Sequence, residues 1–436
     1  ISDELPALAE ALRVYFDPYE VARLLYVLDR EATAEPAPLA SERDGATETL
    51  GTLFLSPRDR DFLKRARTFE VVHPATGRSV PYSLWLQPGE EDVDYIIPGL
   101  GGHRTSNSAV ALAEAVFEAG KSAVTISSSL NFEFIARASS EELPGFLPSD
   151  AHDTHVLIDA IDKDLRARFP GRCAGRRIGG ISFGGITTLY IAASTDPELV
   201  TFDAYLAVNA PLSLEHAARK LDELYNAPMS MPEDARRPWM DALFRKALRL
   251  VDQGVPAGQG DLPFTSLEAQ FLIGLTFRAT LREVILQTQL QHDHGVLHAP
   301  LDRDRRRHVY REIDQFSLTE YVYAFMLPYM ARELGEITSD EAGARELFRR
   351  CDIRSIAPAL KANPRLRFAT NRNDFVLAPG DLEWITELLG PDRVTVFERG
   401  GHLGNLYRDD IQAVLAAEIA EAAGEAEGAG DSAPED

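Results

Sequence analysis

Hydrophobic and polar positions along this chain follow two different periods. Short apolar runs, typical of buried strands, occur at 94–97, 123–127, 177–181, 202–208, 366–370 and 393–397. Segments with helical spacing separate the earlier runs, the clearest at 106–119 and 149–169. Strands that alternate with helices predict a mostly parallel sheet with helices on both faces, so we expect an α/β fold.

Two more apolar runs precede this alternation. They lie at 68–72 and 80–86 and flank the sequence Pro-Ala-Thr-Gly at 74–77. Turn residues between two strand-like runs predict a β-hairpin. Residues 1–65 show helical spacing and fall outside the motifs described below, so we expect an N-terminal helical segment. Packing against the core is favoured, and lining of the cleft is the alternative.

The alternation stops between residues 212 and 358, which have nearly all-helical patterning. Capping-box patterns begin there at Ser317 and Thr338, and Pro328 predicts a kink in the helix that follows Ser317. We therefore expect a helical cap inserted before the penultimate strand.

The insertion divides the expected core into two parts. The core is expected to form from residues 66–211 and 359–422. Residues 423–436 are Glu, Ala, Gly, Asp, Ser and Pro without a periodic apolar face, which predicts a disordered acidic tail.

Composition limits the kind of protein. Apolar residues make up 45% and charged residues 26% of the 436-residue chain, as in ordinary globular proteins. A formal net charge of −23 disfavours nucleic acid as a partner, because phosphates would be repelled. No stretch approaches the roughly 18 uncharged apolar residues of a membrane span, so we expect no integral membrane segment. Oligomeric state and compartment stay open, since cytoplasmic and exported proteins both fit these numbers.

A glycine-flanked serine is the most informative local feature. The sequence Gly-Ile-Ser-Phe-Gly at 180–184 joins the strand predicted at 177–181 to an apolar helix-like run. A sharp strand-to-helix turn can present a serine hydroxyl to a base, and the glycines leave room for the bend. The same pattern also arises in turns where a serine only caps a helix. Ser182 is therefore a candidate nucleophile whose support has to come from elsewhere in the chain.

A second glycine-rich segment, Pro-Gly-Leu-Gly-Gly-His at 98–103, follows the strand predicted at 94–97. Backbone N–H groups at such a place can stabilise the negative charge that develops on a carbonyl oxygen during acyl transfer. We expect the amides of Leu100 and Phe183 to form this oxyanion hole, with Gly101 as the alternative to Leu100. A dinucleotide-binding loop would need a third glycine where Arg104 stands. No cofactor is expected.

A candidate base and a candidate acid come later in the chain. His402 lies in Gly-Gly-His-Leu-Gly-Asn at 400–405, just after the last predicted strand, and Asp374 lies a few residues beyond the strand before it. Carboxyl ends of parallel strands meet at one edge of a sheet, where ligands bind. A carboxylate there can fix the tautomer of an imidazole and stabilise the imidazolium. Ser182, Asp374 and His402 therefore form a candidate catalytic set.

With these motifs the chain resembles the α/β-hydrolase superfamily over about residues 68–211 and 360–422. The segment 98–102 looks like the oxyanion loop of that superfamily, 180–184 like its nucleophile elbow and 401–402 like its histidine loop. The resemblance implies an α/β-hydrolase fold and a serine hydrolase. Ser182 would be the nucleophile, His402 the general base and Asp374 the orienting acid.

The resemblance leaves one alternative for the acid. Some relatives place it after the preceding strand, but Val-Asn-Ala-Pro at 208–211 has no carboxylate and the nearest one is Glu215. Asp374 is therefore preferred. The long interval between Ser182 and Asp374 fits the expected insertion.

The abundant apolar and aromatic residues of 212–358 predict a lid that selects a small-molecule acyl substrate with an apolar group. A carboxylic ester is the first choice. An acyltransferase, an aminopeptidase-like amidase and a non-enzymatic small-molecule receptor on the same fold stay open.

Two further groups of residues are not assigned to a functional site. His292, His294 and His298 could ligate zinc, but no carboxylates on a clear scaffold support them, so we expect a solvated connector and no metal. Cys173 and Cys351 are too few for a disulfide framework or a metal site and are expected to be free thiols or one bridge.

Overall fold

The computed structural model describes residues 43–253, 262–299, 306–335 and 337–430. Within these ranges an eight-stranded sheet has the order β1-β2-β4-β3-β5-β6-β7-β8. Its strands are β1 Arg67–Val72, β2 Ser79–Trp85, β3 Glu91–Ile97, β4 Ser122–Thr125, β5 Cys173–Ile181, β6 Ala204–Val208, β7 Leu366–Asn371 and β8 Val394–Phe397. The strands from β4 to β8 pair in parallel, whereas β1 and β2 form an antiparallel hairpin. The predicted mostly parallel sheet and the predicted hairpin are confirmed.

The burial of each strand explains its sequence pattern. All residues of β4, β6 and β7 are buried, because helices cover both faces of the central sheet. Parallel strands of this kind have continuous apolar runs instead of alternating ones. The edge strand β1 is largely exposed and alternates. Because the inner strands are parallel, the loops that follow them converge at the same edge of the sheet.

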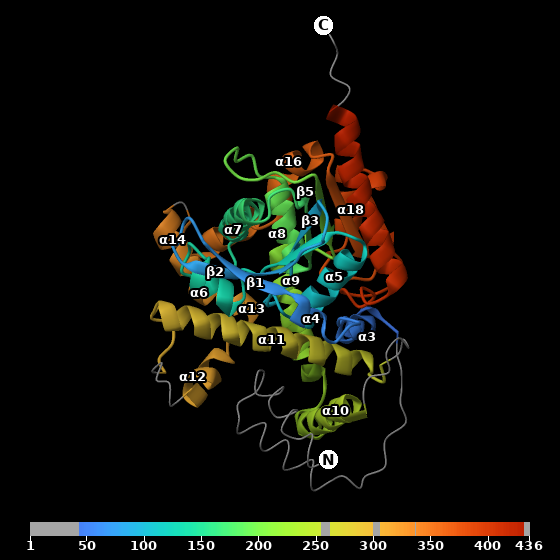
Figure 1. Ribbon diagram of the computed structural model, residues 1–436. Helices are drawn as coiled ribbons and strands as arrows, with labels where there is room; N and C mark the ends of the chain where they lie inside the picture. The colour runs from blue at the N-terminus through green and yellow to red at the C-terminus, as the bar shows by residue number, and fades with distance from the viewer. Residues whose placement is uncertain (1–42, 254–261, 300–305, 336, 431–436) are drawn as a thin grey trace.

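Helices pack on the two faces of the sheet (Figure 1). One face is covered by α5 Asn107–Glu118 and α18 Asp409–Gly430. The other is covered by α7 Leu147–Arg168, α8 Phe183–Ala192 and α17 Asp381–Leu389. The predicted helix at 106–119 begins as expected, with the Ser106 side chain accepting from the Ala109 N–H.

The long interval between β6 and β7 contains helices. They are α9 Leu214–Asn226, α10 Glu233–Gln253, α11 Ser266–Gln291, α12 Arg306–Ile313, α13 Leu318–Tyr321, α14 Leu327–Leu334, α15 Glu341–Arg350 and α16 Ala357–Ala362, with short turns η2 Ala227–Ser230, η3 Val322–Met326 and η4 Ile353–Ile356. Figure 1 shows α11 (yellow) running across one side of the core, with α10 and α12 beyond it. The predicted cap and domain limits stay predictions, although the helical character of this interval is clear.

Of the two predicted capping boxes, one is confirmed and one is wrong. The capping box at Ser317 is confirmed, because its side chain accepts from the Glu320 N–H and Glu320 reaches back. The one predicted at Thr338 is wrong. Asp340 caps α15 instead, since its carboxylate accepts from the Gly343 N–H and the Thr338 hydroxyl donates to that carboxylate.

The helix that follows Ser317 is interrupted just before Pro328, near the predicted kink. A π-helical turn, η3, separates α13 from α14, and Pro328 lies in the first turn of α14. Proline has no backbone N–H to donate to the preceding turn, which fits a break in the regular α-helical hydrogen bonding at this place.

The C-terminal end of the described chain differs from expectation. Residues 423–430, predicted to be a disordered tail, continue α18. The rest of the predicted tail and most of the predicted N-terminal helical segment lie outside the described residues. The part of 1–65 that is described contains α3 Gly45–Thr49, η1 Leu50–Phe54 and α4 Phe62–Arg65. No helix in the described ranges is both long enough and apolar enough to cross a membrane.

Candidate active site

Ser182 lies at a strained turn between β5 and α8. Its backbone has φ 52° and ψ −118°, a conformation that a residue with a side chain adopts only when its surroundings enforce it. A Cβ atom on Gly180 would lie 2.0 Å from the Gly184 carbonyl oxygen, and one on Gly184 would lie 2.2 Å from that of Ile97. The bend is held by the Ser182 N–H, which donates to the Val208 carbonyl at 2.9 Å. The two glycines of the motif are therefore required by close packing.

The three side chains singled out by the sequence lie in one hydrogen-bonded row. His402 Nε2 is 2.8 Å from Ser182 Oγ, and His402 Nδ1 is 3.0 Å from Asp374 Oδ2 and 3.1 Å from Oδ1. All three residues are buried. A carboxylate can only accept, so Nδ1 carries the imidazole proton and Nε2 is left to accept from the serine hydroxyl. This arrangement can deprotonate Ser182 and hold the resulting imidazolium beside a negative charge.

Asp374 has two further donors that fix its carboxylate. Asn209 Nδ2 donates to Oδ2 at 2.6 Å, and the Val376 N–H donates to Oδ1 at 3.1 Å. Asn209 follows β6 with a φ of 49°, a left-handed conformation that asparagine tolerates better than most residues. Sequence patterns predict no role for this asparagine, because 208–211 comes into question there only as the site of an alternative acid. An Asn at a strand end was the available signal.

The glycine-rich loop at 98–103 packs directly against the nucleophile. A Cβ atom on Gly99 would lie 3.3 Å from Ser182 Cβ, so the loop backbone runs beside the serine. Phe183 is the first residue of α8, and the N–H groups of a first helical turn have no acceptor within the helix. Both features suit an oxyanion hole. The assignment of Leu100 and Phe183 as its donors stays a prediction.

A polar network behind the loop holds it in place. Asn131 Nδ2 donates to the Gly101 carbonyl at 2.8 Å. Glu133 accepts from Ser127 Oγ at 2.7 Å and pairs with His103 and Arg104 at 3.3 and 3.2 Å. Burial by itself would raise the pKa of Glu133, but the hydrogen bonds from His103 and Ser127 and the Arg104 charge together lower it. The carboxylate therefore stays ionised and anchors the loop.

An apolar cavity of about 90 Å³ opens beside Ser182 and His402. Side chains of the core and of the helices between β6 and β7 enclose it together. They include Leu100, Leu130, Phe183, Leu214, Ala217, Ala218, Leu221, Phe277, Leu318, Tyr321, Val322, Met326, Leu347, Phe348, Cys351 and Val376. None of these is charged. Such a lining suits a hydrocarbon group attached to a carbonyl carbon at Ser182.

Asp150, in the first turn of α7, lies next to this cavity. Its carboxylate accepts from the Gly145 N–H at 2.9 Å and from Ser129 Oγ at 3.1 Å, and Gly145 lines the cavity. Burial raises the pKa of Asp150 to about 7. Below about pH 4 the folded and unfolded states both hold this proton, and between pH 4 and 7 only the folded state does. Stability contributed by this group is therefore lost as the pH rises from 4 to 7.

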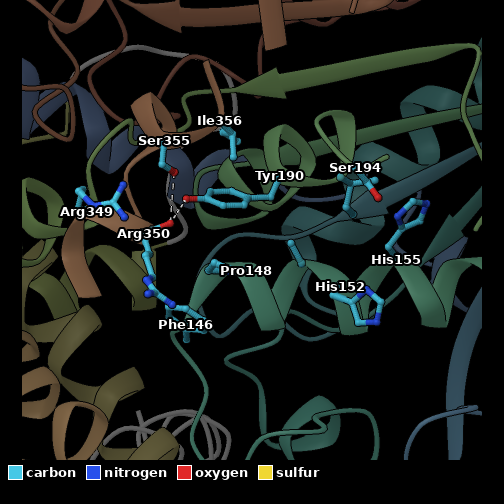
Figure 2. Close-up of a pocket in the computed structure, with 12 residues that line it drawn as sticks. Phe146, Pro148, His152, His155, Tyr190, Ser194, Arg349, Arg350, Ser355 and Ile356 are labelled. Carbon is cyan, nitrogen blue, oxygen red and sulfur yellow. Dashed lines mark hydrogen bonds between the residues drawn. The ribbon is translucent and has the colours of Figure 1, made fainter. Parts of the chain in front are cut away.

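A larger groove of about 550 Å³ lies elsewhere, between α7, α8 and the end of α15, and contains none of the candidate catalytic residues. Figure 2 shows Tyr190 in this groove pointing toward Arg350 and Ser355. The Tyr190 hydroxyl donates to the Arg350 carbonyl at 2.6 Å, and both Arg349 and Arg350 pair with Glu346. Its principal polar groups already have protein partners, so the groove is a weaker candidate than the cavity at Ser182.

The His294 side chain is nearly buried and its Nε2 has no hydrogen-bond partner among the described residues, so the expected solvated connector is wrong at this position. His292 Nδ1 and His294 Nδ1 lie 3.2 and 3.9 Å from the Glu142 carboxylate. Among the described residues there is no group of three or more ligands that could hold a metal ion. Cys173 and Cys351 are buried free thiols, and Cys351 lines the cavity at Ser182.

Comparison with known proteins gives matches among solved structures. No family model matches the chain, and no curated protein does. Among solved structures, the α/β hydrolase GrgF from Penicillium sp. sh18 is similar with a TM-score of 0.43 and 13% identity, over 82% of this chain and 97% of that one. An esterase of Pyrococcus furiosus is similar with a TM-score of 0.42 and 8% identity, over 89% and 99%. The match to Est1E from Butyrivibrio proteoclasticus, with a TM-score of 0.26 and 17% identity, spans 36% of this chain and 56% of that one.

The sheet itself identifies the fold. An antiparallel hairpin leads into a parallel sheet ordered β4-β3-β5-β6-β7-β8, with a serine at the sharp turn after β5. This is the α/β-hydrolase fold, so the fold expected from the motifs is confirmed.

Proposed function

We propose that this protein is a serine hydrolase that cleaves carboxylic esters with an uncharged, apolar acyl group. The observation that carries the proposal is the buried row Ser182–His402–Asp374 at the wall of an apolar cavity. A base within hydrogen-bond reach of a serine, itself oriented by an acid, is the arrangement required for nucleophilic catalysis.

The proposed reaction has two halves. Ser182 Oγ attacks the ester carbonyl carbon while His402 Nε2 takes the hydroxyl proton, and the Leu100 and Phe183 N–H groups stabilise the oxyanion. The bond to the leaving alcohol then breaks, and His402 gives that oxygen its proton. Water, deprotonated by His402, attacks the acyl-enzyme and releases the carboxylic acid, which restores Ser182.

The cavity also bears on the alternative functions. An aminopeptidase-like enzyme needs a carboxylate near the substrate ammonium group, and none is among the residues that line the cavity. An apolar lining favours an acyl chain instead. Acyl transfer to an alcohol would use the same residues, and a receptor would use the same cavity without turnover.

The first test is Ser182→Ala, assayed with p-nitrophenyl butyrate. Turnover is expected to fall by at least about a thousandfold, because no other group can form the acyl-enzyme. A serine-directed phosphonate should label the parent protein at Ser182, as located by mass spectrometry, and should not label the variant.

Ser122→Ala is a matched control, since Ser122 is buried in β4 and its hydroxyl accepts from the Gln87 N–H. It should keep its activity. Retained turnover in a folded Ser182→Ala variant would refute the proposal. Tight ligand binding without hydrolysis or labelling by the parent would favour a receptor, and ester products formed with added alcohol would favour a transferase.

A further inference from the structure

A short N-terminal helix packs on the loop that carries His402, although the two are 353 positions apart in the sequence. The helix, α3, is closed at its start by a capping box in which Asp44 Oδ1 accepts from the Thr47 N–H at 2.8 Å and Thr47 Oγ1 accepts from the Asp44 N–H at 2.9 Å. The Asp44 side chain also bonds to the Ser266 hydroxyl at the start of α11. The start of the helix is thus held by its own capping box and by α11.

Thr49, at the end of α3, contacts the backbone of His402 itself. The His402 N–H donates to Thr49 Oγ1 at 2.7 Å, and Thr49 Oγ1 donates to the Gly45 carbonyl at 2.6 Å. Only 5% of Thr49 and 3% of His402 are exposed. Because the hydroxyl proton is used by Gly45, an oxygen lone pair is directed at the His402 amide. Water cannot readily replace this acceptor in so buried a place.

Glu48 joins the loop of the base to the loop of the acid. Its carboxylate accepts from the Gly400 N–H at 3.0 Å and from Asn373 Nδ2 at 2.7 Å. Asn373 in turn accepts from the Gly401 N–H at 3.0 Å through Oδ1, and it is the residue before Asp374. One carboxylate therefore sets the spacing between the backbone that carries Asp374 and the backbone that carries His402.

The segment 48–51 and the loop that carries His402 touch backbone to backbone. A Cβ atom on Gly51 would lie 2.1 Å from the Gly404 carbonyl oxygen, and one on Gly404 would lie 1.8 Å from that of Glu48. No side chain fits between them, so neither segment can shift toward the other. The contact positions the loop with little freedom.

We propose that Thr49 and Glu48 are positioning residues for the reaction at Ser182. They act through His402 and Asp374 and do not touch the substrate, so this inference rests on the proposed function of those two residues. Residues 43–51 are accordingly part of the active site's framework, whereas the sequence favours packing against the core for residues 1–65 and leaves a place at the cleft as the alternative.

Thr49→Val tests the proposal because valine keeps the shape and removes the acceptor. The buried His402 N–H then loses its partner, and the imidazole moves off line with Ser182 Oγ. Small displacements of a catalytic group cost up to about a hundredfold in rate, so kcat for p-nitrophenyl butyrate is expected to fall by about 10- to 100-fold. KM should change by less than about twofold, since Thr49 is not among the residues that line the cavity.

Two companion variants separate positioning from general destabilisation. Thr49→Ser keeps the oxygen and should restore kcat to within about threefold of the parent. Thr288→Val removes a similarly buried threonine hydroxyl, bonded to the Ile285 carbonyl on α11, and should leave kcat unchanged. Glu48→Ala should lower kcat in the same way as Thr49→Val.

Hydrogen exchange of the 399–406 peptide gives a readout that needs no turnover. Exchange at the His402 amide should become faster in Thr49→Val and not in Thr49→Ser. An unchanged kcat in Thr49→Val, or an equal loss in Thr49→Ser, would overturn the inference while leaving the proposed function standing. A parent that neither hydrolyses esters nor reacts with the phosphonate would instead overturn the proposed function, and the exchange experiment would still decide whether the contact holds the loop.

Discussion

Replacing Asp374 by asparagine should disable the site without changing its shape. The Asp374 carboxylate receives three donors, from His402 Nδ1, Asn209 Nδ2 and the Val376 N–H. An asparagine has only one acceptor oxygen, so its NH₂ group must face one of these donors whichever way it turns. Where the NH₂ group faces His402 Nδ1, His402 has to carry its proton on Nε2 instead. The imidazole then presents a proton to Ser182 Oγ and can no longer take one.

The size of the effect follows from that change of tautomer. A carboxylate-to-amide exchange at the acid of a Ser-His-Asp row costs about 10⁴ in kcat, which corresponds to about 5.5 kcal/mol of transition-state stabilisation. KM for p-nitrophenyl butyrate should change little, because Asp374 is not among the residues that line the cavity. Steady-state kinetics on the folded variant, checked by circular dichroism, measure both quantities.

Asp381→Asn provides the matched control. Asp381 is equally buried at the start of α17, pairs with Arg354 and accepts from the Ala378 N–H at 2.8 Å. Its replacement should lower stability and leave kcat within about threefold of the parent value, because it has no contact with His402. If Asp374→Asn kept more than a tenth of the parent kcat, the assignment of Asp374 as the orienting acid would be wrong.

Two other predictions concern the cavity and its surroundings. Asp150→Asn keeps the acceptor for Gly145 and Ser129 but cannot ionise, so chemical denaturation at pH 8 should show a free energy of unfolding higher by up to about 4 kcal/mol, with a weaker fall between pH 4 and 7. Equal pH slopes for parent and variant would contradict the buried ionisation. Ala217→Leu should fill part of the cavity and lower the butyrate-to-acetate ratio of kcat/KM by more than about tenfold, since each excluded methylene costs about 0.8 kcal/mol. Glu223→Leu, on the exposed side of α9, is the control. An unchanged ratio in Ala217→Leu would mean that the cavity does not bind the acyl group.

Local sequence was sufficient to predict the strands of the sheet and the candidate catalytic side chains. The strand runs and the glycines of 180–184 and 98–103 express constraints that act within a few residues: burial on both faces of a strand, and room for a tight bend. Chain order then placed Ser182, Asp374 and His402 at strand ends that a parallel sheet brings to the same edge. Position 338 was predicted wrongly because Thr338 and Asp340 both suit a helix cap, and only the local geometry decides which one serves.

The support around the candidate residues could not be predicted in the same way. Asn209, Thr49 and Glu48 act through hydrogen bonds to residues far away in the chain, and an isolated Asn, Thr or Glu has no spacing that marks such a bond. The cavity, likewise, exists only where separate helices meet the core. Sequence by itself determined which groups have the chemistry, because strand periodicity and turn sterics are local. Tertiary structure alone decided what holds those groups at 2.8 to 3.1 Å from one another, because such distances depend on packing between segments hundreds of residues apart.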